Sequence, residues 1–200
     1  PRRPRAGTRG AMTERRRVGV FGGSFNPPHI AHVLAVAQVL ATTELEHVLV
    51  VPTFQHPFAK PLASYDDRVA MCERALGWLP RVSVSRVEEE LGGESRTLRT
   101  LEHLAETHPS WALHFVMGAD LVREAPRWFG FARICELAPP IVVGRAGIEG
   151  DDVPSAMLPA VSSTEVRARI AAGAWDELQH LVPRAVLAYV RERGLYAGDG

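Results

Sequence analysis

Two histidines three residues apart, His29 and His32, follow a glycine pair and a proline pair near the start of the chain. Residues at positions i and i+3 share one face of a helix, so the two imidazoles would lie together on a first helical turn. The unpaired N–H groups and the positive dipole end of such a turn favour an anion. Gly22 and Gly23 allow a close approach that side chains would prevent. Either histidine alone could simply cap or pack, but the pair and its spacing favour a phosphate site.

A second candidate anion site lies far along the chain, where hydroxyl side chains at 162–164 precede a helical pattern. Ser162 and Glu165 have the spacing of a capping box, which predicts a helix start with unpaired N–H groups. Arg167 returns to the same face about one turn later, and its guanidinium suits phosphate. The alternative is an ordinary capping box with an exposed arginine. The histidine pair favours the anion site.

Lys60 is the single lysine among 23 Lys and Arg residues, and it follows the second predicted strand. At this position the compact ammonium group of a lysine would suit a phosphate better than a guanidinium would. Chance composition is the alternative.

Strand and helix patterns alternate along the chain, which is how these distant segments would be brought together. We expect strands at residues 17–21, 47–51, 82–86, 112–117 and 141–143. We expect helices at 29–40, 64–78, 97–108, 162–172 and 183–193. This alternation predicts an α/β protein with a Rossmann-like, doubly wound parallel sheet and a small C-terminal helical part. Ligands bind such sheets beyond the carboxyl ends of the strands, where Asp120 and Arg145 would lie.

Length and composition narrow the class of protein. The 200 residues are 46% hydrophobic and 23% charged, which favours one folded domain over 17–196, with 162–196 as its helical part. No apolar run is long enough to span a membrane, and no apolar signal region follows the basic start, so we expect a cytoplasmic protein without a membrane partner. Cys72 and Cys135 lack metal-binding spacing and are expected to be free, buried thiols.

Charge is unevenly distributed, although the formal net charge is zero. Residues 1–17 carry seven arginines and one acid, so the remaining 183 residues have a net charge of −6. We expect residues 1–16 to form a disordered basic extension. A nucleic-acid-binding arm is the alternative, but the segment has no aromatic residue for base stacking, so we expect no nucleic-acid partner.

The glycine-rich segment does not match two common nucleotide-binding motifs. It lacks both the G-x-x-x-x-G-K-[ST] phosphate loop and the G-x-G-x-x-G dinucleotide fingerprint. Residues 22–32, with the sequence GGSFNPPHIAH, resemble instead the G-x-F-x-P-x-H-x-G-H signature of the nucleotidyltransferase superfamily. Within that superfamily, residues 17–196 resemble the bacterial nicotinate-nucleotide adenylyltransferases. The motifs that carry this resemblance are Val51-Pro52, Ser95–Leu101, Met117–Asp120, Trp128, Arg145–Gly147 and Val161–Arg167.

The resemblance implies an enzyme of NAD biosynthesis that joins nicotinate mononucleotide to the AMP moiety of ATP and releases pyrophosphate. It implies His29, His32 and Arg167 as catalytic residues, with Mg²⁺ carried by ATP and no metal site of the protein's own. The residues it implies for ATP are Gly22, Gly23, Ser24, Phe25, His29, His32, Lys60, Gly118, Asp120, Ser162, Ser163, Thr164 and Arg167. Those for the nicotinate nucleotide are Thr97, Trp128 and Arg145, with Trp128 stacked on the pyridine ring.

Four positions depart from the family pattern. Ala31 replaces a glycine, Asn26 an aspartate, and Arg96 and Arg99 a tyrosine and an aspartate. The two arginines add positive charge near the acceptor, which would favour the carboxylate of nicotinate over neutral nicotinamide. Another nucleotidyltransferase, such as phosphopantetheine adenylyltransferase or a cytidylyltransferase, and a non-catalytic nucleotide sensor are the alternative functions.

Overall fold

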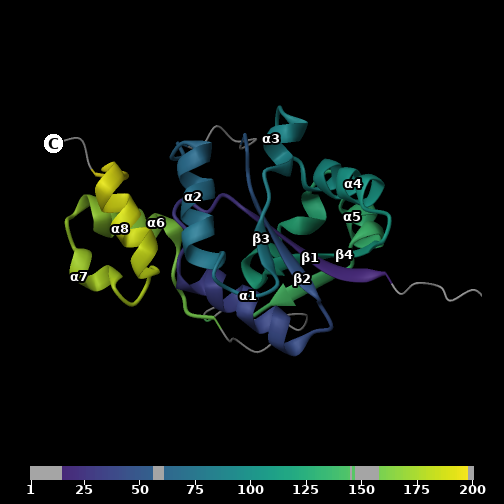
Figure 1. Cartoon of the computed structure of the whole chain (residues 1–200), viewed down its shortest axis with the longest axis horizontal. Coiled ribbons are helices and arrows are strands. Elements are labelled where there is room, and N and C mark those ends of the chain that lie inside the picture. The colour runs from purple at the N-terminus through teal and green to yellow at the C-terminus, as the bar shows by residue number, and fades with distance from the viewer. Residues whose placement is uncertain (1–14, 56–60, 145, 147–157, 198–200) are drawn as a thin grey trace, which may run out of the picture.

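A five-stranded parallel sheet runs through the centre of the molecule (Figure 1). The computed structural model describes residues 15–55, 61–144, 146 and 158–197, and the statements below concern these ranges. The strands are β1 (Arg16–Gly23), β2 (His47–Pro52), β3 (Val82–Val84), β4 (Trp111–Gly118) and β5 (Pro140–Val143). Their order is β3-β2-β1-β4-β5, and every neighbouring pair is parallel. The chain therefore reverses its direction of winding between β1 and β4, where such sheets bind ligands.

Helices cover both faces of the sheet, as expected for a doubly wound fold. One face packs against α1 (Ile30–Thr42) and α2 (Tyr65–Leu76). The opposite face packs against α3 (Val87–Leu91), α4 (Thr97–Thr107) and α5 (Phe131–Leu137). Because side chains alternate along a strand, Val18 and Val20 of β1 face the second group while Phe21 faces the first. The predicted fold class is confirmed.

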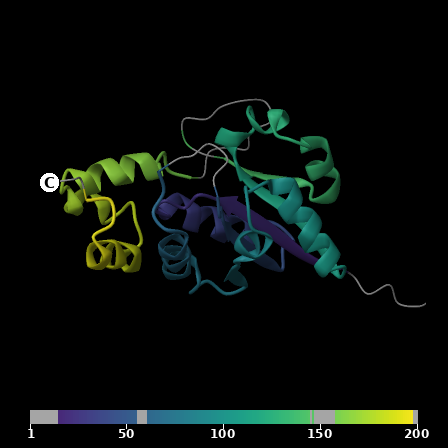
Figure 2. The ribbon, with the colours of Figure 1, turned by 90° about the horizontal axis from the view of Figure 1, so that it is seen from above.

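Three further helices, α6 (Ser163–Ala171), α7 (Trp175–Leu178) and α8 (Arg184–Arg193), lie together at one end of the molecule (Figures 1 and 2). α8 packs against α2, where the Tyr189 hydroxyl donates to Asp67 Oδ1 at 2.8 Å and Arg193 Nε lies 3.2 Å from the same oxygen. These contacts fix α8 to the helix that follows β2.

Helix starts match their capping signals closely, but several ends differ from the predictions. Ser64 Oγ accepts from the Asp67 N–H and Ser162 Oγ from the Glu165 N–H, as capping residues do. His29 caps α1 rather than beginning it, and Pro183 likewise precedes α8. α2 ends at Leu76, two residues before the predicted end, and β3 ends at Val84 rather than at residue 86.

The sequence analysis missed three short helices, α3, α5 and α7, and two 3-10 turns, η1 (Ala119–Leu121) and η2 (Ala125–Arg127). Elements of three to seven residues have little stability alone and depend on packing for their formation. Cys72 is a buried free thiol, whereas Cys135 is partly exposed, contrary to expectation. Within the described ranges, no helix has the length and apolarity needed to cross a membrane.

Candidate functional site

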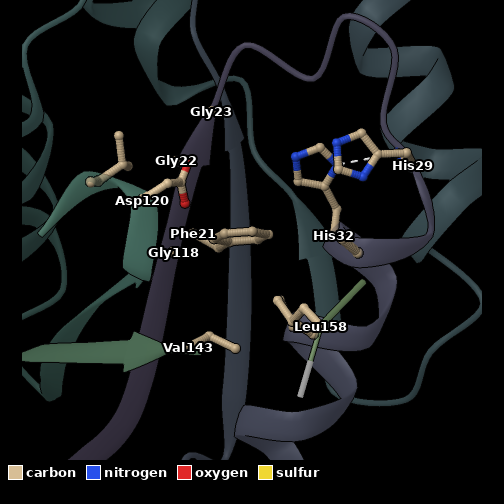
Figure 3. A pocket seen from close by; sticks show the side chains of 12 residues that line it. Phe21, Gly22, Gly23, His29, His32, Gly118, Asp120, Val143 and Leu158 are labelled. Atoms are coloured by element: carbon tan, nitrogen blue, oxygen red, sulfur yellow. Dashed lines mark hydrogen bonds between the residues drawn. The ribbon is translucent and has the colours of Figure 1, made fainter. Parts of the chain in front are cut away.

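A cavity of about 170 Å³ lies where β1 and β4 end, at the switch in strand order (Figure 3). The loops after parallel strands meet at this edge, so residues distant in sequence become neighbours there. The residues that line the cavity are Phe21, Gly22, Gly23, His29, Ala31, His32, Ala35, Gly118, Asp120, Leu121, Val143 and Leu158. Six of them, Gly22, Gly23, His29, His32, Gly118 and Asp120, are predicted ATP-binding residues.

The two histidines stack on each other at the start of α1. Their ring centroids are 3.8 Å apart, and His32 Nδ1 accepts a hydrogen bond from the His29 backbone N–H at 3.1 Å. A neutral imidazole that accepts through Nδ1 carries its proton on Nε2. The buried ring of Phe25 packs edge-on against His32, with the two ring centroids 5.0 Å apart, and limits how that imidazole can rotate. The His32 ring is therefore held in one orientation, with its N–H at Nε2.

Glycines keep the strand ends open beside the histidines. A Cβ at Gly22 would meet no atom within 4 Å, although the residue lines the cavity. A Cβ at Gly118 would collide with the Asp120 carboxylate, which folds back over the end of β4. Figure 3 shows Asp120 on one side of the end of β1 and the histidines on the other. An elongated anionic ligand could pass between them over bare backbone.

The second predicted anion site lies against the first. Residues 24–29, which connect β1 to α1, are called the first loop below. Arg167 Nη1 donates to the Asn26 carbonyl at 2.7 Å, and Ser163 Oγ donates to the Pro27 carbonyl at 2.8 Å. Arg167 Nη2 also lies 3.3 Å from Thr164 Oγ1. Two sites that are more than 130 residues apart in sequence are therefore held together by direct hydrogen bonds.

Arg68 is a residue that the sequence analysis missed. Only 1% of it is exposed, and its guanidinium donates to the carbonyls of Ser24 at 3.0 Å, Ala63 at 3.1 Å and Phe54 at 3.4 Å. Burial lowers the pKa of the guanidinium, and the three carbonyls compensate for the lost water. Arg68 thereby connects the first loop to the segment after β2. Its helical spacing from Met71, Cys72 and Ala75, all on the buried face of α2, is the signal that could have identified it.

Thr97 and Trp128, the predicted acceptor residues that the structure describes, lie on the α4 and α5 side of the sheet and do not line the cavity. Thr97 is the first residue of α4, and the Trp128 ring meets Phe115 edge-on at 6.0 Å. The two segments are neighbours, because a Cβ at Gly130 would collide with Leu98. Six of the described residues predicted to bind ATP also do not line the cavity: Ser24, Phe25, Ser162, Ser163, Thr164 and Arg167. Phe25 is buried.

The arginines at 96 and 99 already have partners. Arg96 Nη2 lies 2.6 Å from Glu94 Oε2, so a carboxylate offsets its charge. Arg99 donates to the carbonyls of Gly92 at 2.6 Å and Leu91 at 2.7 Å, where α3 ends. Glu94 thus offsets the positive charge of Arg96, whereas Arg99 keeps its charge and has a structural role at the end of α3.

Two predicted ligand-binding residues, Lys60 and Arg145, lie outside the described residues, as does most of the predicted extension at 1–16. In the part of the chain that the structure describes, no group of three or more His, Cys, Asp or Glu side chains could hold a metal ion. Asp120 contributes a carboxylate to the cavity. A single protein carboxylate would suit a metal ion whose other ligands are mainly phosphate oxygens.

Comparison with known proteins identifies the family to which the chain belongs. Residues 20–169 match the family model described as cytidylyltransferase-like. The chain thus belongs to the cytidylyltransferase-like family, and its fold is that of an α/β nucleotidyltransferase. Two curated relatives are named "probable nicotinate-nucleotide adenylyltransferase". The one from Anaeromyxobacter sp. (strain K) is 46% identical, covering 94% of this chain and all of the relative. The one from Thermus thermophilus is 36% identical, covering 90% of this chain and 99% of the relative. The chain belongs to the nicotinate-nucleotide adenylyltransferase family.

A solved structure supports the fold independently. The nicotinic acid mononucleotide adenylyltransferase of Plasmodium falciparum, in complex with NaAD, superposes with a TM-score of 0.79. The match covers 90% of this chain and 97% of that one, at 17% sequence identity. At so low an identity the likeness concerns the fold alone.

Proposed function

We propose that this chain joins nicotinate mononucleotide to the AMP moiety of ATP, giving nicotinate adenine dinucleotide and pyrophosphate. Family membership supports this activity. The observation that carries the assignment to this site is the contact between α6 and the first loop. Arg167 and Ser163 bind the carbonyls of Asn26 and Pro27, directly before the histidine pair. One polyphosphate can therefore contact both anion-binding segments.

The reaction requires no nucleophile from the protein. A phosphate oxygen of nicotinate mononucleotide attacks the α-phosphorus of ATP and forms the new P–O bond. The bond from that phosphorus to the oxygen bridging to the β-phosphate breaks, and pyrophosphate leaves with the electron pair. Positioning of the two phosphates and stabilisation of the developing negative charge account for catalysis of such a step.

His29, His32 and Arg167 have the chemistry for that stabilisation. His32 Nε2, which carries the proton while Nδ1 accepts from His29 N–H, donates to a phosphate oxygen in the transition state. His29 stacks beside it and binds the same polyphosphate. A guanidinium has five N–H donors, and the two contacts described use one each, so Arg167 can hold the first loop and a phosphate together.

The remaining ATP contacts would come from the cavity lining and from the start of α6. Gly22 and Gly23 let phosphates approach the backbone, and the hydroxyls and amides at 162–164 add donors at the start of α6. Asp120 and Gly118 lie toward the adenosine. Mg²⁺ arrives with ATP and offsets part of the triphosphate charge.

Thr97 and Trp128 would form the acceptor side, with the indole stacked on the pyridine ring. The backbone amides at the start of α4 suit the nicotinate carboxylate, because a helix N-terminus favours an anion. We expect the deamido substrate to be preferred, with the reaction taking place in the cytoplasm.

A pyrophosphate-release assay with Mg-ATP and each pyridine mononucleotide tests the function. We expect kcat/KM for nicotinate mononucleotide to exceed that for nicotinamide mononucleotide by at least about tenfold, because binding a carboxylate at an electropositive site differs from binding a neutral amide by about 1.4 kcal/mol or more. Mass spectrometry identifies the dinucleotide. Equal values for the two acceptors would contradict the preference. Turnover with 4′-phosphopantetheine as the only accepted acceptor would overturn the function. So would nucleotide binding without release of pyrophosphate from ATP in the presence of any acceptor.

A further inference from the structure

Asn26, in the middle of the first loop, receives hydrogen bonds from two other parts of the chain. Its side chain is buried, with 2% of the residue exposed. Oδ1 accepts from the Ala63 N–H at 2.9 Å and from the Tyr196 hydroxyl at 2.8 Å. Tyr196 is 170 residues away in sequence and belongs to the segment after α8. The segment after α8 therefore touches the first loop, which leads into the histidine pair.

The segment that ends α8 places Tyr196 for this contact. Gly194 ends the helix in the left-handed conformation at φ 60°, and Tyr196 itself has φ 62°. A bulky residue rarely adopts a positive φ, so tertiary contacts must stabilise this conformation. Burial raises the pKa of Tyr196, so the hydroxyl keeps its proton at neutral pH and can donate it to Asn26.

The first loop depends on such contacts because of its composition. Pro27 and Pro28 have no backbone N–H, so amide hydrogen bonds cannot hold the two residues between Asn26 and His29. The loop is held mainly through its acceptors, by Arg68 of α2 on one side and by Ser163 and Arg167 of α6 on the other. The Tyr196 hydroxyl adds an anchor from a third element.

We propose that Tyr196 is a positioning residue for adenylyl transfer, fixing the first loop through Asn26 so that His29 and His32 face the polyphosphate. The proposal rests on the function proposed above and adds a residue that does not line the cavity. A structural role alone would affect only stability. A positioning role also affects kcat, because small displacements of catalytic donors lower the rate.

A matched pair of variants separates these roles. Tyr196→Phe removes the hydroxyl that binds the first loop and keeps the ring. Tyr189→Phe makes the same chemical change in α8, where the lost hydroxyl binds Asp67 of α2 and does not touch the loop. Steady-state kinetics at 15 °C, thermal unfolding by circular dichroism, and calorimetry with the non-reacting analogue α,β-methylene-ATP are measured for both variants. The folded fraction from circular dichroism corrects each kcat.

Both variants are expected to lose about 2–4 °C in Tm, because each loses one side-chain hydrogen bond. Only Tyr196→Phe should lower kcat, by about tenfold, and weaken binding of the analogue by about fivefold. The KM for nicotinate mononucleotide should stay within about twofold, because Trp128 and Thr97 lie on the opposite face of the sheet. Tyr189→Phe should keep the wild-type kcat within about twofold.

Asn26→Ala removes the acceptor and completes a double-mutant cycle. Alone it should lower kcat by at least about tenfold, and adding Tyr196→Phe should then change kcat by less than about twofold, because the hydroxyl has lost its partner. Equal kcat and equal analogue affinity for the two Tyr→Phe variants would overturn the inference. So would a full tenfold effect of Tyr196→Phe in the Asn26→Ala background. A wild-type chain that binds the analogue but releases no pyrophosphate would instead overturn the proposed function, and the calorimetric comparison would still test the positioning of the loop.

Discussion

His32 is the side chain on which turnover should depend most. Its Nδ1 accepts a hydrogen bond from the His29 N–H and its ring packs against Phe25, so the imidazole is held in one orientation with its proton on Nε2. Replacing His32 with alanine should lower kcat by about two or more orders of magnitude while leaving the fold intact, which is the cost of losing one such donor in the transition state. Pyrophosphate release and circular dichroism measure the two effects.

Leu34, two residues along the same helix and 40% exposed, provides the control position. Leu34→Ala shortens a side chain of α1 that does not line the cavity. This variant should therefore keep the wild-type kcat. Near-normal turnover of the His32→Ala variant would exclude His32 from the mechanism.

The contact between α2 and α8 should make the stability of the enzyme depend on pH through Asp67. The hydrogen bond from the Ser64 hydroxyl is the main cause that lowers the pKa of this carboxyl below 3.8, with further help from Tyr189 and Arg193. A carboxyl that binds its proton less tightly when folded stabilises the protein above its unfolded pKa, and the stabilisation is lost as pH falls through the folded pKa. Asp67→Asn should therefore reduce the free energy of unfolding by about 1–2 kcal/mol at pH 7. This difference should shrink steadily below about pH 4.

Urea unfolding of the wild type and the variant between pH 3 and pH 7 measures this difference. A difference that stays constant across the range, or grows as the solution is acidified, would show that ionisation of Asp67 does not stabilise the folded chain.

Across the whole molecule, the features that the sequence predicted are those encoded locally. The five strands, the histidine pair and the cap of α6 each depend on residues within a few positions of one another. Arg68 and Tyr196 could not be found in that way, because their partners in the first loop lie 44 and 170 residues away in sequence. The short helices α3, α5 and α7 were not predicted for a related reason, because packing rather than helix propensity stabilises them. The predicted roles of all the site residues, including His29, His32 and Arg167, stay predictions.

In the proposed mechanism, the start of α1 and the start of α6 bind one polyphosphate. A crystal structure with Mg²⁺ and α,β-methylene-ATP tests it most directly. We expect the triphosphate to lie over Gly22 and Gly23, within hydrogen-bonding distance of His32 Nε2 and of the Arg167 guanidinium. A triphosphate that contacts only one of these two side chains, or lies outside the cavity between β1 and β4, would contradict the account.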